Sequence, residues 1–525
     1  MQAGPAAAER PVNRWLVSLA VMLGTFMVVL DTTVVNVSLP HIAGSLNASI
    51  EETTWALTTY LTANAVILPI TGWLANFFGR KRLLLISIGG FTAASVLCGM
   101  APTLPFLILF RVIQGATGGV MQPLSQAIML EAFPPRERGE AMAFFGIGIV
   151  VAPIFGPVLG GWLTDNLSWR WVFYVNIPFG ALALLMVWRH IFDPHYIRRA
   201  AGGVDYWGLG LLVIGVAALQ ISLDQGQKED WLASPWITGL LVVALAGLTL
   251  FVIHALRIRA PVADLRVFGD RTYSTGVLLV AMQSFGLYAS LVLMPVLLQT
   301  LMGYPSLQAG IAMAPRGLGS LIVTPIVGVA LGKARTDPRK LLAVGMGVCA
   351  WSMYWLSALN LDAGYWDIFW PQFVQGVGLG MLFVPLATVS MDRIPREGMG
   401  NATSLFNLVR NIGGGIGIAL VQTLLARDRQ GHTNTLIAHV NPYDPAAQQM
   451  FQNLRSAFVS RGVDPVTATD RAYGALWGMV QRQAAIQAFL DAFVLLAVVF
   501  LAMVPLVMLL KKPQHHVEPA MPAAD

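Results

Sequence analysis

Leu16–Val37 reads LVSLAVMLGTFMVVLDTTVVNV, an apolar run that contains a single acidic residue, Asp31. A helix needs about 20 mostly apolar residues to cross the hydrocarbon core of a bilayer, and this run is long enough. An acid inside such a helix costs at least about 2.5 kcal/mol, so its presence indicates a function. The run follows Arg10 and Arg14 and lacks a small-residue cleavage site, which predicts a retained membrane helix and not a removed signal peptide.

Long apolar runs of this kind recur along the whole chain. No run shows the alternation that is typical of a membrane β-strand, so the expected fold is an all-α integral membrane protein. We predict fourteen membrane helices, at roughly 16–37, 54–75, 83–101, 105–129, 141–163, 171–189, 205–224, 236–256, 273–300, 307–332, 340–359, 366–390, 401–425 and 487–510.

The composition supports this prediction. Of the 525 residues, 56% are hydrophobic and 11% are charged, whereas a soluble domain is on average about 25% charged. So few charges cannot solvate the surface of a soluble globule of this length, which excludes a cytosolic or secreted protein. Cys98 and Cys349 have no partner at metal-site or disulfide spacing, and no Walker-type loop is present. We therefore expect no metal site and no cofactor.

Lysine and arginine predict the orientation of the chain in the membrane. They gather in alternate connections between the spans, for example at Arg80-Lys81-Arg82, Arg198-Arg199 and Arg339-Lys340. Because basic loops stay on the cytoplasmic side, we predict that the N- and C-termini are both cytoplasmic. This distribution explains the net charge of +6 without nucleic acid as a partner.

An internal repeat divides the predicted helices into two halves. Gln114-Gly115 in the fourth span and Gln375-Gly376 in the twelfth lie 261 residues apart. Transporters are commonly built from such repeats, with the substrate path between the halves. We predict a 6+2+6 arrangement, with a six-helix half at 1–203, a two-helix insert at 204–260, a second six-helix half at 261–512 and a disordered tail at 513–525.

A long polar connection, 426–486, precedes the last span and is expected outside the membrane on the extracytoplasmic side. Its segments Ala446–Val459 and Val466–Gln481 have helical patterns, and residues 441–445 are typical of turns. We therefore predict a small extracytoplasmic hairpin. Connections of this length are usually either functional or disordered.

Asp31 and Arg111 are predicted to lie at the same depth in the membrane. Each is about six residues from the outer end of its span, at about 1.5 Å of rise per residue. Pairing would offset the burial of both charges, and a cation that is released when the carboxylate takes a proton gives a simple coupling switch. We assign proton coupling to both residues; a purely structural ion pair is the alternative.

Residues 152–161, APIFGPVLGG, place small side chains on one face of the fifth span. Gly156 and Gly160 have the four-residue spacing that lets helices pack closely, and Pro153 and Pro157 weaken the backbone hydrogen bonding and bend the helix. We predict a kink that takes part in gating; close packing alone is the alternative.

Polar side chains within the spans are candidates for a substrate cavity between the halves. The polar candidates are Gln114, Gln122, Gln126, Gln283, Gln375, Asn407 and Arg410. Met282 and Tyr288 suit an adaptable apolar pocket. The alternatives are interhelical hydrogen bonding for the polar residues, and a core or lipid-facing position for the other two.

Residues 72–82, GWLANFFGRKR, resemble the Gly-x-Leu-Ala-Asp-x-x-Gly-Arg-Lys signature of the major facilitator superfamily. Gly72, Gly79 and Arg80 match this signature, and Asn76 stands where the family usually has an acid that helps to gate the inner side. Arg111, with Gln114 and Gly115, resembles the fourth-helix motif, whose arginine is tied to proton coupling. Residues 152–161 resemble the fifth-helix motif of the antiporters. Taken alone, the basic loop indicates only an anchor for the anionic leaflet.

Further motifs resemble the fourteen-helix drug:proton antiporters of the EmrB type. They are LDTTVVNV at 30–37, WRWVFYVNIP at 169–178, LDQG at 223–226 and NATSL at 401–405. The resemblance implies a proton-coupled multidrug efflux antiporter that exports hydrophobic compounds across the cell inner membrane. It also implies a tripartite system, in which the 426–486 connection docks to a periplasmic adaptor of the EmrA type that leads to an outer-membrane channel.

Three other functions stay open from the sequence. An exporter or symporter for one specific metabolite would use the same fold. A membrane-embedded enzyme would need a catalytic centre, but no histidine lies deep in a predicted span and no nucleophile–base pair is evident. A scaffold or sensor that transports nothing would not need Asp31 in the membrane. We expect a transporter and no enzyme activity.

Overall fold

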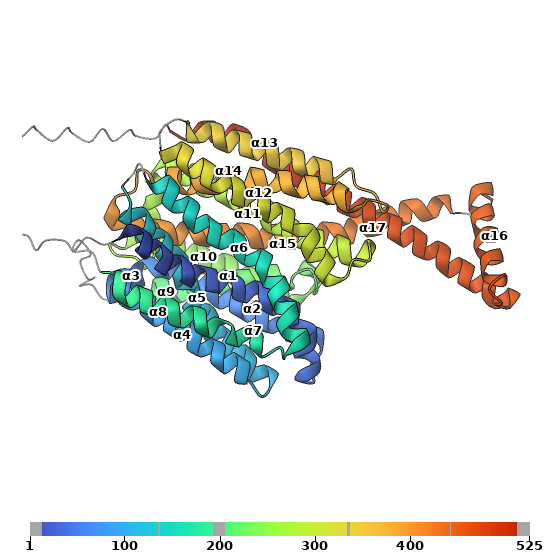
Figure 1. The fold of residues 1–525 in the computed structure, drawn as a ribbon, viewed down its shortest axis with the longest axis horizontal. Coiled ribbons are helices and arrows are strands. Elements are labelled where there is room, and N and C mark those ends of the chain that lie inside the picture. The colour runs from blue at the N-terminus through green and yellow to red at the C-terminus, as the bar shows by residue number, and fades with distance from the viewer. Residues whose placement is uncertain (1–12, 135–136, 193–204, 333–335, 441–442, 512–525) are drawn as a thin grey trace, which may run out of the picture.

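The computed structural model describes residues 13–134, 137–192, 205–332, 336–440 and 443–511 (Figure 1). These residues form helices and short helical turns, and none of them is in a β-strand. The predicted domain boundary at 203/204 and the predicted tail at 513–525 lie outside the described residues.

Seventeen α-helices follow one another along the described chain. The first eight are α1 (Arg14–Ser45), α2 (Ile50–Ile67), α3 (Thr71–Phe78), α4 (Arg80–Met100), α5 (Leu104–Ala132), α6 (Arg138–Asn166), α7 (Trp171–Tyr174) and α8 (Asn176–His190). The next two are α9 (Tyr206–Gln225) and α10 (Pro235–Arg257), which correspond to the predicted insert. The rest are α11 (Arg271–Val296), α12 (Ser306–Gly332), α13 (Pro338–Leu356), α14 (Tyr365–Met391), α15 (Met399–His439), α16 (Pro445–Val459) and α17 (Pro465–Leu506).

Each of the fourteen predicted spans falls on a helix or on two consecutive helices. Thirteen helical segments among the described residues are long and apolar enough to cross a membrane. The remaining predicted span is α13, which has 19 residues and packs against α14 and α17. The second span differs from a single helix, because a 3-10 turn at Leu68–Ile70, with Pro69 inside it, separates α2 from α3.

Local sequence determines where several helices begin. Ser49 and Glu52 form a capping box at the start of α2, since the Ser49 hydroxyl accepts from the Glu52 N–H at 3.1 Å and the Glu52 carboxylate accepts from the Ser49 N–H at 2.8 Å. Gly79 has a φ of +84° between α3 and α4, a conformation that glycine adopts without a steric penalty. Gly79 therefore makes the sharp turn between the two helices, and the basic residues Arg80, Lys81 and Arg82 lie in the first turn of α4.

The helices before α9 and those after α10 pack as two groups. In the N-terminal group, α1 packs against α6 and α8, and α2 against α5; in the C-terminal group, α11 packs against α15, and α12 against α14. Gly115 of α5 lies against the backbone of Tyr60 in α2, and Gly376 of α14 lies against the backbone of Arg316 in α12. The two glycines of the sequence repeat therefore make equivalent close contacts in the two groups.

The two groups contact each other near one end of the bundle. We call this the terminal end, because the described chain begins there at Asn13 and ends there at Lys511; the opposite end, from which α16 projects, is the hairpin end (Figure 1). Near the terminal end, Asn407 of α15 donates a hydrogen bond to Gln126 of α5 at 2.8 Å. There too α6 packs against α12. The structure therefore has the halves joined at the terminal end.

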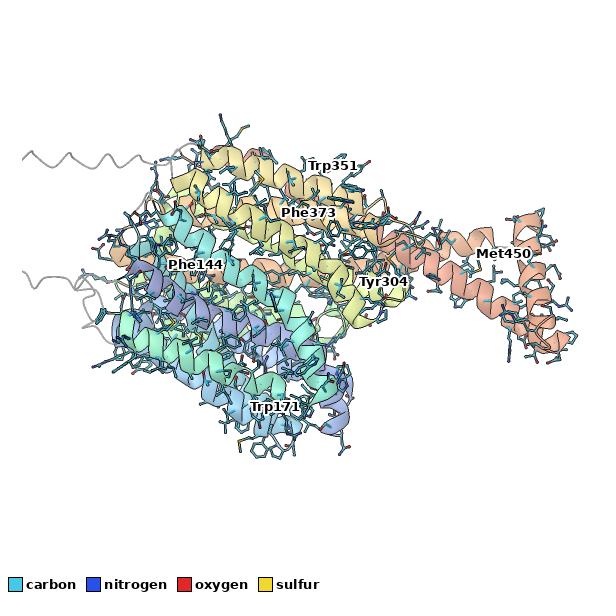
Figure 2. All side chains as sticks on the ribbon, in the orientation of Figure 1. Phe144, Trp171, Tyr304, Trp351, Phe373 and Met450 are labelled. Carbon is cyan, nitrogen blue, oxygen red and sulfur yellow. The ribbon has the colours of Figure 1, made fainter. Side chains whose placement is uncertain are left out.

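Large apolar side chains cover the outside of the bundle. Trp171 and Trp351 point away from it (Figure 2) and are 48% and 60% exposed. A soluble protein rarely exposes apolar surface on this scale, whereas a bilayer accommodates it. The outer surface is therefore one that lipid covers.

The 426–486 connection forms the predicted helical hairpin, with one difference. α15 and α17 both continue beyond the bundle, and α16 lies across the tip (Figure 1). The segment 466–481 is the first part of the 42-residue helix α17, which runs without a break into the last span. The reason is local, because residues 479–490 contain no proline or glycine and are rich in helix formers.

Two neighbouring glycines of α6 test the close contact between α1 and α6. A β-carbon on Gly160 would lie 2.9 Å from the carbonyl oxygen of Val34, whereas one on Gly161 meets nothing within 4 Å. Gly160→Ala should therefore destabilise the protein by about 1–3 kcal/mol through overpacking, and Gly161→Ala should not. The midpoint of thermal unfolding in detergent measures both variants, and equal midpoints would contradict the packing of α6 on α1.

Candidate functional site

Asp31 and Arg111 meet inside the N-terminal group of helices. Asp31 lies in α1 and Arg111 in α5, and both side chains are fully buried. Nη1 of Arg111 donates to Oδ2 of Asp31 at 2.6 Å, a short distance that is typical of a charge-assisted hydrogen bond. The structure therefore brings together the two residues that depth along the helices predicted as a pair.

Two amide side chains complete the surroundings of the carboxylate. Oδ1 of Asp31 accepts from Nε2 of Gln114 at 2.9 Å and from Nδ2 of Asn176 at 2.8 Å. Both amides also donate to Oγ of Ser95 in α4, at 2.6 Å and 3.1 Å. Asp31 therefore receives three N–H donors from α5 and α8.

The guanidinium of Arg111 is held on its other sides by α2 and by its own helix. Nε donates to the carbonyl oxygen of Ala56 at 3.1 Å, and Nη1 also donates to Oε1 of Gln114 at 2.6 Å. The group lies over the ring of Tyr60, 4.0 Å from its centroid, which is a favourable cation–π position. Nη2 has no hydrogen-bond partner in the described structure, so the site can offer one further donor.

The predicted gating residues lie in two places. Arg80 and Glu131 form a buried ion pair that links α4 to the end of α5 near the terminal end, and Glu131 is a partner that the sequence analysis did not assign. Gly72 of α3 lies against the backbone of Asn401 at the start of α15, so this motif touches the opposite half. Asn76 also lies on α3 and is partly buried.

In the fifth-helix motif, Gly156 and Gly160 of α6 pack against Thr33 and Val34 of α1. Thr33 and Val34 lie two and three residues after Asp31 along α1. Pro153 and Pro157 lie within α6, which continues through both. The gating role of this motif stays a prediction, because the contacts show only that α6 rests on the segment of α1 that carries Asp31.

The predicted cavity residues make different kinds of contact. Gln114 belongs to the Asp31 network, Gln126 and Asn407 bind each other across the two halves, and Gln375 donates to Ser290 at 3.0 Å. The remaining candidates differ in exposure: Gln283 is buried, Gln122, Met282 and Arg410 are partly buried, and Tyr288 is exposed. A role in substrate binding stays a prediction for these residues.

Sequence reasoning missed two members of the network, Asn176 and Ser95. Asn176 lies in the WRWVFYVNIP motif, and its amide within an apolar span could have marked it as a candidate. The sequence around Ser95 contains no comparable signal. Arg316 of α12 is 6% exposed and donates to Gln372 at 2.8 Å and to Ser290 at 3.4 Å. It forms no ion pair with a carboxylate of the described residues.

Thermal unfolding tests whether Asp31 and Arg111 stabilise each other. Arg111→Ala should lower stability by about 3–5 kcal/mol, because the carboxylate is left buried without its cation. Adding Asp31→Asn to that variant should restore part of the loss, since it removes the unpaired charge. A double variant that is as unstable as the sum of the two single variants would contradict direct coupling.

A family model and individual relatives agree on the family. A sequence model of the Major Facilitator Superfamily matches residues 21–418. The multidrug export protein EmrB of Haemophilus influenzae is 41% identical over 440 residues, which are 84% of this chain and 86% of that protein. The fatty acid resistance protein FarB of Neisseria gonorrhoeae is 35% identical over 499 residues, 95% of this chain and 96% of that protein. EmrB of Escherichia coli K12 is 36% identical and covers 95% of both chains.

A solved structure shares the fold at low sequence identity. The human organic anion transporter MFSD10 (TETRAN) superposes with a TM-score of 0.61 at 14% identity, over 95% of this chain and 100% of that one. At this identity the likeness shows the fold alone. The family match covers most of the chain, and the all-α fold with its membrane-spanning helices agrees with it. The chain therefore belongs to the Major Facilitator Superfamily and is a multi-pass membrane transporter, not an enzyme.

Proposed function

We propose that this transporter is a proton-driven exporter of hydrophobic compounds in the cell inner membrane. The observation that carries the proposal is the buried Asp31–Arg111 pair, at 2.6 Å and without solvent exposure. Ionisable groups within membrane spans mark ion pathways and proton relays. The names of the relatives support export, since EmrB is described as a multidrug export protein and FarB as a fatty acid resistance protein.

Proton binding at Asp31 would change the balance of charge inside the N-terminal half. In the described structure, Asp31 is the carboxylate that offsets the buried guanidinium of Arg111. Once the carboxyl is neutral, Arg111 is a buried cation without a counter-charge, which costs several kcal/mol. The protonated protein therefore favours a conformation in which water or another acceptor reaches Arg111. That preference couples proton uptake to a conformational change.

The architecture supplies the element that this preference would bias. α6 touches the Asp31 segment of α1 through Gly156 and Gly160, and it packs against α12 of the opposite half. A change around Asp31 is therefore transmitted through one helix to the interface between the halves. Rocking of the halves exposes a central path alternately to each side, and proton release on the cytoplasmic side would complete the cycle.

The hairpin suits a partner outside the membrane. It projects beyond the bundle (Figure 1), and among its apolar side chains Tyr443, Val466, Tyr473 and Trp477 are exposed. Phe451, Leu454 and Phe458 of α16 are partly buried, and the Phe451 ring packs on Tyr473 with centroids 4.4 Å apart. We assign docking of a periplasmic adaptor of the EmrA type, which leads to an outer-membrane channel, to the exposed set.

Asp31→Asn tests the proton-coupling role. The substitution keeps the size of the side chain and removes the titratable group, so export driven by a proton gradient should be lost while the protein still folds. The matched control is Asp165→Asn, at an exposed carboxylate near the end of α6. Transport into inverted vesicles, with a panel of unrelated hydrophobic compounds, measures both variants.

The same assay separates the proposal from its rivals. If Asp31→Asn still exports compounds against their concentration gradient at the wild-type rate, the assignment of proton coupling to Asp31 is wrong. Transport of only one compound of the panel would indicate an exporter or symporter for a specific metabolite on the same fold. No transport of any compound by the wild type, with a proton gradient of either direction, would favour a sensor.

Deletion of residues 434–480, bridged by a short Gly/Ser linker, tests the docking role. The ends lie close together, because Gln481 donates to Thr433 at 3.4 Å, so the bundle should remain intact. Transport in liposomes should be preserved and resistance of whole cells should fall, since cargo no longer reaches the adaptor. The double variant Trp477→Ala/Tyr473→Ala should also keep transport in liposomes, and it should lower the resistance of whole cells less than the deletion does. Unchanged resistance together with unchanged co-purification of the adaptor excludes docking through the hairpin.

A further inference from the structure

A cleft of about 650 Å³ lies toward the hairpin end, between the α9–α10 connection and α15. Its volume is within the range of sites that bind small molecules. Most of its lining is apolar, from Leu223, Leu232, Leu241, Ile416 and Leu420. Leu232, Ile416 and Leu420 are also exposed on the surface of the bundle. The cleft is therefore open to the surroundings of the helices and is not part of the Asp31 network.

The wall formed by the α9–α10 connection is held in a strained conformation. Asp230 and Trp231 have φ values of +56° and +51°, which residues other than glycine rarely adopt. The strain is maintained by the indole of Trp231, whose Nε1 donates to Oγ1 of Thr423 in α15 at 2.8 Å. Gly226 makes room for this ring, since a β-carbon there would lie 2.6 Å from it. Backbone strain of this kind persists where the surroundings enforce it, often at ligand sites.

Two opposite charges line the cleft at the level where the helices leave the predicted spans. Asp230 lies between α9 and α10, and Arg427 lies about two and three turns beyond Leu420 and Ile416 on α15. Neither side chain forms an ion pair or a hydrogen bond with another described residue. The cleft thus combines an unpaired anion and an unpaired cation at its polar edge with an apolar interior.

We propose that this cleft binds a zwitterionic phospholipid that carries a primary ammonium group. The phosphate pairs with Arg427, the ammonium pairs with Asp230, and an acyl chain fills the apolar part between α10 and α15. An anionic lipid or a fatty acid would satisfy Arg427 and leave Asp230 facing a like charge or nothing. The inference does not depend on which compound the transporter exports.

Native mass spectrometry of the purified full-length protein in detergent tests the proposal. The probes are phosphatidylethanolamine, phosphatidylglycerol and phosphatidylcholine with identical oleoyl chains, together with oleate. Phosphatidylethanolamine should bind most tightly. Arg427→Gln should weaken all three phospholipids by about fivefold, the effect of about 1 kcal/mol for one cation at a membrane surface. Asp230→Asn should abolish the preference for phosphatidylethanolamine over phosphatidylglycerol.

A third variant and a matched control make the result specific to the cleft. Ala419 is buried in its lining, so Ala419→Phe should reduce binding of phosphatidylethanolamine without changing either charge. Arg471→Gln with Asp470→Asn, at exposed positions of the hairpin, should bind like the wild type. The proposal is overturned if phosphatidylethanolamine binds the three cleft variants and the wild type equally. It is also overturned if oleate binds as tightly as phosphatidylethanolamine, which would make the cleft a site for anionic chains.

Discussion

The ion pair between Asp31 and Arg111 is the interaction on which the packing of the N-terminal helices depends. Two charges inside a membrane protein are tolerated only when each is compensated, and here the compensation comes from four helices besides α1. α5 supplies Arg111 and Gln114, α8 supplies Asn176, α4 supplies Ser95, and α2 supplies the carbonyl of Ala56. The helices are therefore joined through one hydrogen-bond network around the Asp31–Arg111 pair.

The two halves share close helix contacts at equivalent glycines, but only the N-terminal half has a buried ion pair of this kind among the described residues. At the positions 261 residues after Arg111 and Gln114 the C-terminal half has Gln372 and Gln375, and its buried cation, Arg316, comes from a different helix and bonds to Gln372. No carboxylate pairs with Arg316 among the described residues. A proton can therefore alter the charge balance of the N-terminal half in a way that has no counterpart in the other. This asymmetry fits a rocking motion that one half controls.

Sequence patterns predicted the spans because the bilayer imposes one length and one polarity on every crossing helix. They also predicted the Asp31–Arg111 pair, because the rise per residue of an α-helix gives the depth of each residue in the membrane from its position in the span. They missed Ser95 and Asn176, whose contacts depend on how α4 and α8 rotate against α1. For the nine cavity candidates, polarity marks a residue that needs a partner and does not say whether that partner is substrate. Gln126 and Asn407, for example, bond to each other. The unbroken α17 was missed because polarity changes along it while helix propensity does not.

The central claim is that Asp31 carries the proton that drives export. The most direct measurement is the release of protons when an exported compound is added to the purified protein in weakly buffered detergent solution. The account predicts that the wild type releases protons on binding, and that Asp31→Asn binds the same compound and releases none. Equal proton release from both proteins would contradict the account, because another group would then be the one that titrates.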